Sequence, residues 1–429
     1  MSKIKRIAPL AIVLIMALAF FAACGGNDET EIVFAWWGGD GRYAQTTEVV
    51  ELFLAQSDDV DYVERVVAAW ADYWGMMGAR AAAGDMPDVF QQDVSRLVEY
   101  FESNLKIDLA PYIRDGSINT DYIPQAVIDA GRVNGVVVGI PTGMNVTAMV
   151  YNKGLLDSLG LEAPRNITLD QFIDLARAVY AQGGVRTNWA YNDPANQMEV
   201  HLRAQGVNLF EGNALGGTAD NYVEFFQVVR QGIDEGWHLR PEHMAGRAGA
   251  EQNPMWYPPG DGDANLRVWN SPVWSNMVTG YVNDAPDGMM LNMTTYPSHN
   301  PQVSNFGRAA MFLSVSTHSE NPDAAVSLID FFMNSVEAHQ IMLGDRGVIV
   351  NSRVADAVYP VLPPAAQMQT EFVAWTNNGN STPFNPTRPE GAGEVIELLN
   401  DITERVTFGE LSPREAADLF FAQGNAILG

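Results

Sequence analysis

Aromatic side chains alternate with acidic, amide and basic side chains in several short segments of this chain. Residues 36–42 read Trp-Trp-Gly-Gly-Asp-Gly-Arg, and residues 70–74 place two tryptophans four positions apart. A sugar ring has an apolar face that an aromatic plate can cover, and Asp, Asn, Gln and Arg can hydrogen-bond to its hydroxyl groups. The combination therefore indicates carbohydrate binding. The alternative for any single tryptophan is the hydrophobic core, to which Trp189 and Trp237 are assigned.

Sequence signals for cofactors, metals and catalysis are absent. The chain has no glycine-rich nucleotide motif, no HExxH motif and no GxSxG motif. Residues 261–265 begin like a calcium loop, but Leu266 and Pro272 stand where a glycine and a glutamate are required. The single cysteine excludes a cysteine-cluster zinc site. We expect no metal, no cofactor and no enzymatic activity, although the many carboxylates leave a glycosidase pair open.

Acidic residues outnumber basic residues by 52 to 25 in the 429-residue chain, which gives a formal net charge of -27. Duplex nucleic acid and anionic lipid surfaces attract basic proteins, so the charge argues against both as partners. The length predicts two or three domains, and the hydrophobic content of 47% is sufficient for packed cores.

Residues 1–23 have the composition of a secretory signal peptide. Three cations precede an uncharged run, residues 7–23, and Cys24 follows directly. The sequence Phe-Ala-Ala-Cys at 21–24 resembles the lipobox of bacterial lipoproteins, in which the signal is cleaved before a cysteine that receives a lipid. We expect an exported, lipid-anchored protein with a short tether at 24–30. An uncleaved helix and a signal without a lipid are the alternatives, although 17 apolar residues are short for a membrane span.

Strand and helix patterns alternate after the tether, which is typical of an α/β fold. Residues 31–37 and 87–90 resemble buried strands, and residues 46–54 and 66–83 have apolar side chains at helical spacing. Ligands of parallel α/β sheets bind at the carboxyl ends of the strands, and residues 36–42 come directly at the end of the first strand.

Local signals locate further elements along the chain. Asn134-Gly135 predicts a hairpin turn, and residues 146–151 predict a strand. Helix starts are indicated at Thr168, at Asn321-Pro322 and at Ser412. Residues 237–305 have little periodicity, so we expect loops and short elements there, of the kind that often carry function.

Seven segments, in their order and spacing, resemble the extracellular solute-binding proteins of bacterial ABC importers. They match the carbohydrate-binding branch, which includes maltose-binding protein, and the resemblance extends from Ile32 to Leu428. The segments are residues 34–42, 70–93, 139–156, 274–276, 319–332, 345–352 and 390–399. The resemblance implies a two-lobed periplasmic-binding-protein-like α/β fold of type II, with the ligand between lobes that hinge crossings join. Lobe 1 would comprise residues 31–145 and 311–350, and lobe 2 residues 146–310 and 351–429.

The resemblance also implies a set of ligand-binding residues, which fall on three loops of lobe 1, on the first crossing and on lobe 2. Val94 stands where this branch often has an aromatic residue, which bears on the identity of the sugar. The implied residues are Trp36, Trp37, Asp40, Arg42, Asp72, Tyr73, Trp74, Asp93, Asn145, Trp274 and Asn276.

The function that the resemblance implies is capture and delivery of a sugar or oligosaccharide. Hinges near Asn145, Met311 and Val350 would close the lobes, and the closed monomer would dock on a membrane permease at the outer face of the cell membrane. The alternatives are an exported glycoside hydrolase and a surface glycan-binding adhesin or sensor. Acidic oligosaccharides remain possible ligands because Arg42 or Arg308 could bind them.

Overall fold

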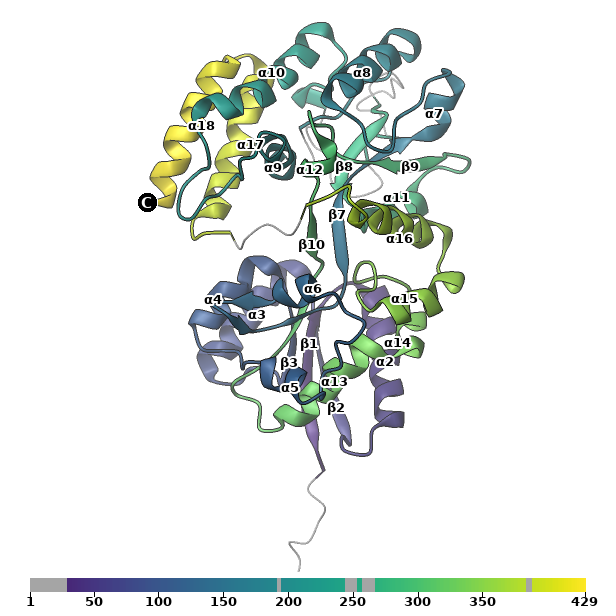
Figure 1. Ribbon diagram of the computed structural model, residues 1–429, viewed down its shortest axis with the longest axis vertical. Coiled ribbons are helices and arrows are strands. Elements are labelled where there is room, and N and C mark those ends of the chain that lie inside the picture. The colour runs from purple at the N-terminus through teal and green to yellow at the C-terminus, as the bar shows by residue number, and fades with distance from the viewer. Residues whose placement is uncertain (1–28, 191–193, 244–252, 257–266, 383–387) are drawn as a thin grey trace, which may run out of the picture.

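The computed structural model describes residues 29–190, 194–243, 253–256, 267–382 and 388–429, which form two lobes arranged along the long axis (Figure 1). The expected signal peptide, Cys24 and the calcium-like segment 261–265 lie outside the described residues. Within these ranges no helix has both the length and the apolar character needed to cross a membrane.

The sheet of lobe 1 has five strands in the order β2-β1-β3-β11-β6. Strand β1 is parallel to β2 and β3, so the carboxyl ends of these three strands lie at one edge, while β11 is antiparallel to β3. The chain crosses to lobe 2 at this same edge, after β6 and before β11. The strands are β1 (Glu31–Trp37), β2 (Tyr62–Ala68), β3 (Val89–Gln92), β6 (Ile140–Pro141) and β11 (Phe312–Val315).

Helices cover both faces of this sheet (Figure 1). One core cluster contains Phe34 of β1 together with Val49 of α2 and Phe332 of α13. The other contains Ala35 of β1 and Tyr73 of α3. The helices are α2 (Asp40–Gln56), α3 (Trp70–Ala83), η1 (Val94–Arg96), α4 (Leu97–Glu102), α5 (Ala110–Arg114), α6 (Gln125–Asp129), α13 (Pro322–Asn334) and α14 (Val336–Met342).

The helix predicted at residues 66–83 is wrong at its start. Residues 66–68 belong to β2 and pair with residues 35–37 of β1, and the helix begins only at Trp70. Val66 and Val67 are β-branched and fit a strand that β1 can hydrogen-bond, so pairing overrides the apparent helical spacing. The predicted strand at 31–37 is confirmed, and the strand predicted at 87–90 lies at Val89–Gln92.

The sheet of lobe 2 is built around the long strand β7, which pairs antiparallel with three others. Trp274 lies opposite Thr147, and Arg308 lies opposite Asn145, so all of these residues lie near the end of the sheet that faces lobe 1. The strands are β7 (Met144–Asn152), β8 (Asn270–Trp274), β9 (Leu291–Thr294) and β10 (Gly307–Ala309).

Two helical layers surround this second sheet (Figure 1). The larger core joins α8, α9 and α10 to the C-terminal helices, and Trp189 and Trp237 are confirmed as core residues, each 1% exposed. Helices α11 and α16 contribute to the other core. The helices of lobe 2 are α7 (Lys153–Ser158), α8 (Leu169–Gly183), α9 (Pro194–Arg203), α10 (Ala219–Glu235), η2 (Pro241–His243), α11 (Met277–Asp284), α12 (Pro301–Ser304), α16 (Pro364–Asn377), α17 (Ala392–Phe408) and α18 (Pro413–Leu428). Helix α15 (Ser352–Val358) packs against α14 of lobe 1 and is followed by η5 (Tyr359–Val361).

The local signals of the sequence are confirmed where they were strongest. Thr168 and Ser412 form capping boxes at the starts of α8 and α18, and Pro322 begins α13. Asn134 and Gly135 have positive φ angles between the short strands β4 (Arg132–Val133) and β5 (Val136–Val137).

Segments from three parts of the sequence form a hydrogen-bonded band between the lobes. Met144 and Val348 exchange backbone hydrogen bonds of 2.9 Å, and the Ala310 N–H donates to the Gly143 carbonyl at 2.8 Å. Glycine is required at Gly347, where φ is 99° and a Cβ atom would lie 2.9 Å from the Cβ of Ala310. The expected hinge residues Asn145, Met311 and Val350 lie in or beside this band.

Replacing Gly347 tests how tightly the band is packed. We expect Gly347→Ala to lower the free energy of unfolding by about 2–4 kcal/mol, because strain at positive φ adds to the clash with Ala310. Gly379→Ala is the matched control, since its φ is 82° and no atom lies within 4 Å of the added Cβ. Urea unfolding would measure both variants, and an equal loss in both would contradict close packing of the band.

Candidate functional site

Three loops of lobe 1 begin where β1, β2 and β3 end, at the edge of the sheet that faces lobe 2. Four aromatic residues at the end of β1 and at the start of α3 form a cluster, named here the aromatic cluster: Trp37, Trp70, Tyr73 and Trp74. The ring centroids of Trp37 and Trp70 are 5.0 Å apart, and those of Trp70 and Trp74 are 5.3 Å apart. Trp70 is 49% exposed, so the cluster presents an aromatic surface at this edge.

Two of the predicted ligand contacts are core residues in the structure. Successive side chains of a strand point to opposite faces, so Trp36 enters the core beside Phe34 while Trp37 joins the aromatic cluster. Trp36 and Tyr73 are each 0% exposed and offer no surface to a ligand. The Tyr73 hydroxyl donates to the carbonyl oxygen of Gln91 at 2.8 Å, and burial raises its pKa well above the usual value. Both residues therefore pack in the core of lobe 1 and do not contact a ligand.

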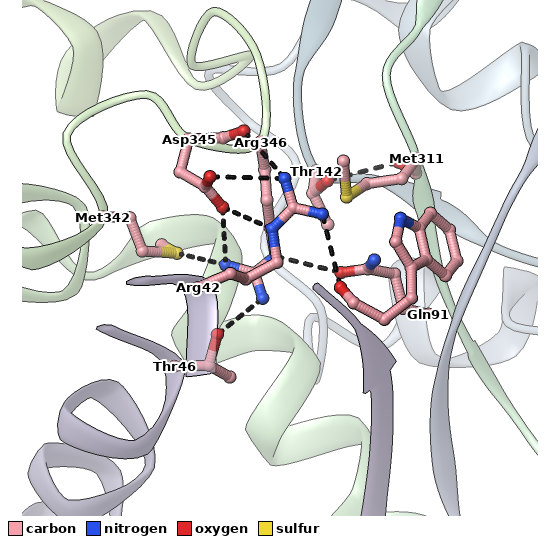
Figure 2. A network of polar contacts seen from close by, with 9 residues as sticks. Arg42, Thr46, Gln91, Thr142, Met311, Met342, Asp345 and Arg346 are labelled. Carbon is pink, nitrogen blue, oxygen red and sulfur yellow. Dashed lines mark hydrogen bonds and ion pairs between the residues drawn. The ribbon is translucent and has the colours of Figure 1, made fainter. Parts of the chain in front are cut away.

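The predicted polar residues of lobe 1 occupy different positions around the edge. Asp40 and Asp72 are exposed in the first turns of α2 and α3. Asp93 follows β3 and caps η1, where its carboxylate accepts from the Ser95 N–H at 2.9 Å and from the Ser95 hydroxyl at 2.7 Å. Arg42 forms an ion pair with Asp345, with 2.6 Å between its Nε and the Asp345 Oδ2 (Figure 2).

Lobe 2 contributes Trp274 and Arg308 to the facing surface. The Arg308 guanidinium lies 4.0 Å from the ring centroid of Trp274, a cation–π contact that covers the ring, and Trp274 is 7% exposed. Asn145 is buried, with its Oδ1 3.4 Å from the Gln369 Nε2. The Oδ1 of Asn276 is buried and has no hydrogen-bond partner among the described residues, so one acceptor is available there.

A cavity of about 150 Å³ lies between the lobes and brings two predicted residues together, Asp93 from lobe 1 and Trp274 from lobe 2. Val94, Phe306, Arg308 and Arg388 also line this cavity. A second cavity of about 570 Å³ shares Val98 and Arg388 with the first. Together the two spaces reach the size range of small-molecule sites, roughly 300–1,000 Å³.

The second interlobe cavity has a polar wall that the sequence did not indicate as a site. Arg132 and Asn134 come from the β4–β5 hairpin of lobe 1, and Glu199, Glu211 and Glu390 come from lobe 2. Only the hairpin signal at Asn134-Gly135 could have located part of it. A further cavity of about 730 Å³ between α7 and α16 lies wholly on lobe 2 and contains none of the predicted residues.

No cluster suited to a metal ion occurs in the part of the chain that the structure describes. There, no group of three or more His, Cys, Asp or Glu side chains is arranged to hold one. The interlobe surfaces instead combine aromatic rings, amides, carboxylates and guanidinium groups, which suit a polar, uncharged or weakly charged ligand with apolar faces.

The sequence of residues 48–396 matches the family described as bacterial extracellular solute-binding protein, and the chain belongs to this family. The family and the two-lobed fold expected from the sequence are therefore both confirmed.

The chain is similar to one curated protein over a quarter of its length and to solved solute-binding proteins over most of its length. The melibiose/raffinose/stachyose-binding protein MelE of Bacillus subtilis is 29% identical over 108 residues, which span 25% of this chain and only 24% of MelE. A periplasmic solute-binding protein of Pectobacterium atrosepticum superposes with a TM-score of 0.79 at 18% identity, over 93% of this chain and 98% of that chain. An ABC substrate-binding protein of Listeria monocytogenes, solved in complex with cycloalternan, superposes with a TM-score of 0.74 at 18% identity, over 93% and 99%.

Proposed function

We propose that this protein captures a sugar or oligosaccharide between its lobes outside the cell and delivers it to the permease of an ABC importer. The observation that carries the proposal is the aromatic cluster at the edge of lobe 1 that faces lobe 2, where Trp70 is half exposed. A separate interlobe cavity, lined by Asp93, Trp274 and Arg308, supplies polar groups from both lobes. Membership of the solute-binding family supports it, as do the sugars named for MelE and for the Listeria protein.

Closure of the lobes would couple binding to delivery. A ligand favours the closed form only to the extent that it contacts both lobes better in that form. Side chains from both lobes line the interlobe cavities, so a ligand there would satisfy this condition. Trp70 and Trp74 would cover apolar sugar faces, with the buried Trp37 packed behind them, and Asp93 and Asn276 would accept hydrogen bonds from hydroxyl groups.

The hydrolase alternative has less support. A glycosidase needs two carboxyl groups directed at one bond, one of them able to donate a proton. Asp93 is held by Ser95, and the Glu199 carboxylate accepts from the Leu209 N–H at 2.9 Å and lies 3.7 Å from the Arg203 guanidinium. Both carboxylates are therefore engaged with neighbouring groups of the protein, an arrangement that suits a structural or binding role.

A panel of glycans tests the proposal directly. A ligand that binds only the folded protein must raise its melting temperature. If the protein only binds the glycan, the glycan recovered after incubation should be chemically unchanged. We expect a shift with at least one of melibiose, raffinose, stachyose or cycloalternan, with oligogalacturonides as the acidic comparison. A shift accompanied by new reducing ends would favour the hydrolase, and no shift with any glycan would contradict the carbohydrate proposal.

Truncation of Trp70 tests the aromatic cluster. We expect Trp70→Ala to weaken binding of the active glycan roughly 5–150-fold, because a stacking surface worth about 1–3 kcal/mol is lost. Tyr62→Ala is the matched control: Tyr62 is also 49% exposed on lobe 1 but lies at the amino end of β2, at the opposite edge. Calorimetric titration would measure both variants, and equal affinities would place the ligand elsewhere.

We also propose that a lipid on Cys24 anchors the mature protein as a monomer at the outer face of the membrane. The anchor would need only the thiol, so Cys24→Ala should move the protein from the detergent phase to the aqueous phase in a detergent partition of cells. Asn27→Ala, in the same tether, should leave it in the detergent phase. Unchanged partition of the Cys24 variant would contradict lipidation at this residue.

A further inference from the structure

Lys106 places an ammonium group in the interior of lobe 1. The residue follows α4, is 5% exposed, and pairs by its backbone with Ser316, which follows β11. Its Nζ donates to Gln92 Oε1 at 2.5 Å, and it forms no ion pair with a carboxylate among the described residues. An ammonium group without an anion is costly to bury, so core packing alone would favour an apolar side chain at this position.

Gln92 connects Lys106 to the turn that follows β3. Gln92 is the last residue of β3 and is buried, and its Nε2 donates to the carbonyl oxygen of Arg96 at 3.4 Å. The Arg96 N–H donates to the Asp93 carbonyl oxygen at 3.1 Å, and Asp93 caps the same turn through Ser95. Gln92 therefore holds the end of the turn that Asp93 begins, and Lys106 holds Gln92.

This turn, residues 93–96, contacts both parts of the candidate site. Its first three residues line the interlobe cavity of about 150 Å³. The guanidinium of its last residue, Arg96, lies 5.6 Å from the ring centroid of Trp74, a cation–π contact with the aromatic cluster. A displacement of the turn would therefore move a hydrogen-bonding wall of the cavity and a neighbour of the aromatic surface together.

We propose that Lys106 is a positioning residue of the ligand site, because its ammonium group holds Gln92 and, through Gln92, the turn that carries Asp93. The inference rests on the proposed function for its ligand, whereas the attachment of the turn is a property of the protein without a ligand. A charge-assisted hydrogen bond is roughly twice as strong as a neutral one, so the turn is held most firmly while Lys106 is protonated. The buried charge thus serves the geometry of the site.

The attachment depends on pH because burial lowers the pKa of Lys106 to about 7. Ligand binding should be strongest below this pH and weaken as the pH rises through it, since Lys106 then loses its proton. Stability should change in the opposite direction. The unfolded chain binds the same proton more tightly, so the contribution of Lys106 to stability is lowest below pH 7 and increases until the unfolded chain is also deprotonated, near pH ~10.4.

The ionisable groups around Lys106 do not produce this change. Burial is the cause of the lowered pKa, and none of these groups forms an ion pair with Lys106. Burial also raises the pKa of Tyr100, so this phenol stays neutral through the same range. The ionisable side chains on or beside β3, η1, α4 and the end of β11 are Asp88, Asp93, Arg96, Glu99, Tyr100 and His318.

The titration of Lys106 can be followed directly, because residues 24–429 contain two lysines, Lys106 and Lys153. Lysine labelled with carbon-13 at Cε gives one signal from each, and Lys106→Met assigns the signals by removing one. We expect the Lys106 signal to titrate near pH 7. Gln92→Glu places a carboxylate against the ammonium group and should raise this midpoint by roughly 1–3 pH units. A Lys106 midpoint at the ordinary lysine value, about 10.4, would overturn the pH dependence.

Hydrogen–deuterium exchange tests the attachment of the turn without any glycan. We expect Lys106→Met to speed exchange in peptides that cover residues 93–102 roughly 3–10-fold at about pH 6, because the turn loses one anchoring hydrogen bond. Lys153→Met is the matched control: Lys153 pairs with Asp157 at 2.6 Å on α7 of lobe 2, so these peptides should exchange at the parent rate.

Melting curves of the same samples show that the variants are folded. If Lys106→Met does not fold, Gln92→Leu removes the same link from its other end. Exchange at the parent rate in the folded variant would overturn the positioning role.

Calorimetric titration with the active glycan connects the attachment to binding. We expect Lys106→Met to weaken binding roughly 3–10-fold at about pH 6 and to match the parent at about pH 8.5, where the parent has itself lost the charge. Gln92→Glu should move this loss of affinity to higher pH. An affinity loss of equal size at both pH values would mark a merely structural role and overturn the charge dependence. If no glycan binds, the sugar proposal fails, and the exchange rates still decide whether Lys106 positions the turn.

Discussion

The lobes have separate hydrophobic cores, and only a narrow hydrogen-bonded band connects them. No buried apolar layer runs through this band in the part of the chain described, and its backbone bonds join residues 142–144, 310–311 and 348. Core packing resists deformation, whereas a few hydrogen bonds around glycines can rotate at small cost. The arrangement therefore concentrates flexibility at the crossings and keeps the binding surfaces on two rigid bodies.

The direction of the lobe 1 strands brings the aromatic and polar side chains of the candidate site to the edge of the sheet that faces lobe 2. Parallel pairing of β1, β2 and β3 brings loops from residues 38, 69 and 93 to the edge where the chain crosses between the lobes. Alternation along β1 then divides two adjacent tryptophans between two tasks, because Trp36 fills the core while Trp37 supports the exposed ring of Trp70. The position of the aromatic cluster on one face of β1 thus depends on how Trp36 packs in the core on the other face.

Features that depend on neighbouring residues were predicted correctly from the sequence, whereas features that depend on contacts between distant segments were not. Capping boxes and the Asn134-Gly135 turn involve neighbouring residues, so their signals were sufficient. The valines at 66 and 67 fit both a helix and a strand, and only pairing with β1 resolved them. Strict alternation could have assigned Trp36 to the core, but the partner of Arg42 lies 303 positions away, and no pattern in residues 36–42 indicates it.

The C-terminal helices have a consequence for how the chain can fold. Phe420 of α18 packs against Tyr222 of α10, with ring centroids 5.5 Å apart, and β11 pairs with β3 across more than two hundred residues. Neither lobe can assemble its full core from a contiguous stretch, since each needs segments that emerge late in synthesis. Contacts of such sequence separation slow folding and delay commitment to the native state. The N-terminal half alone would expose apolar surface, and lobe 2 in particular cannot complete its core until α18, the last helix, is available.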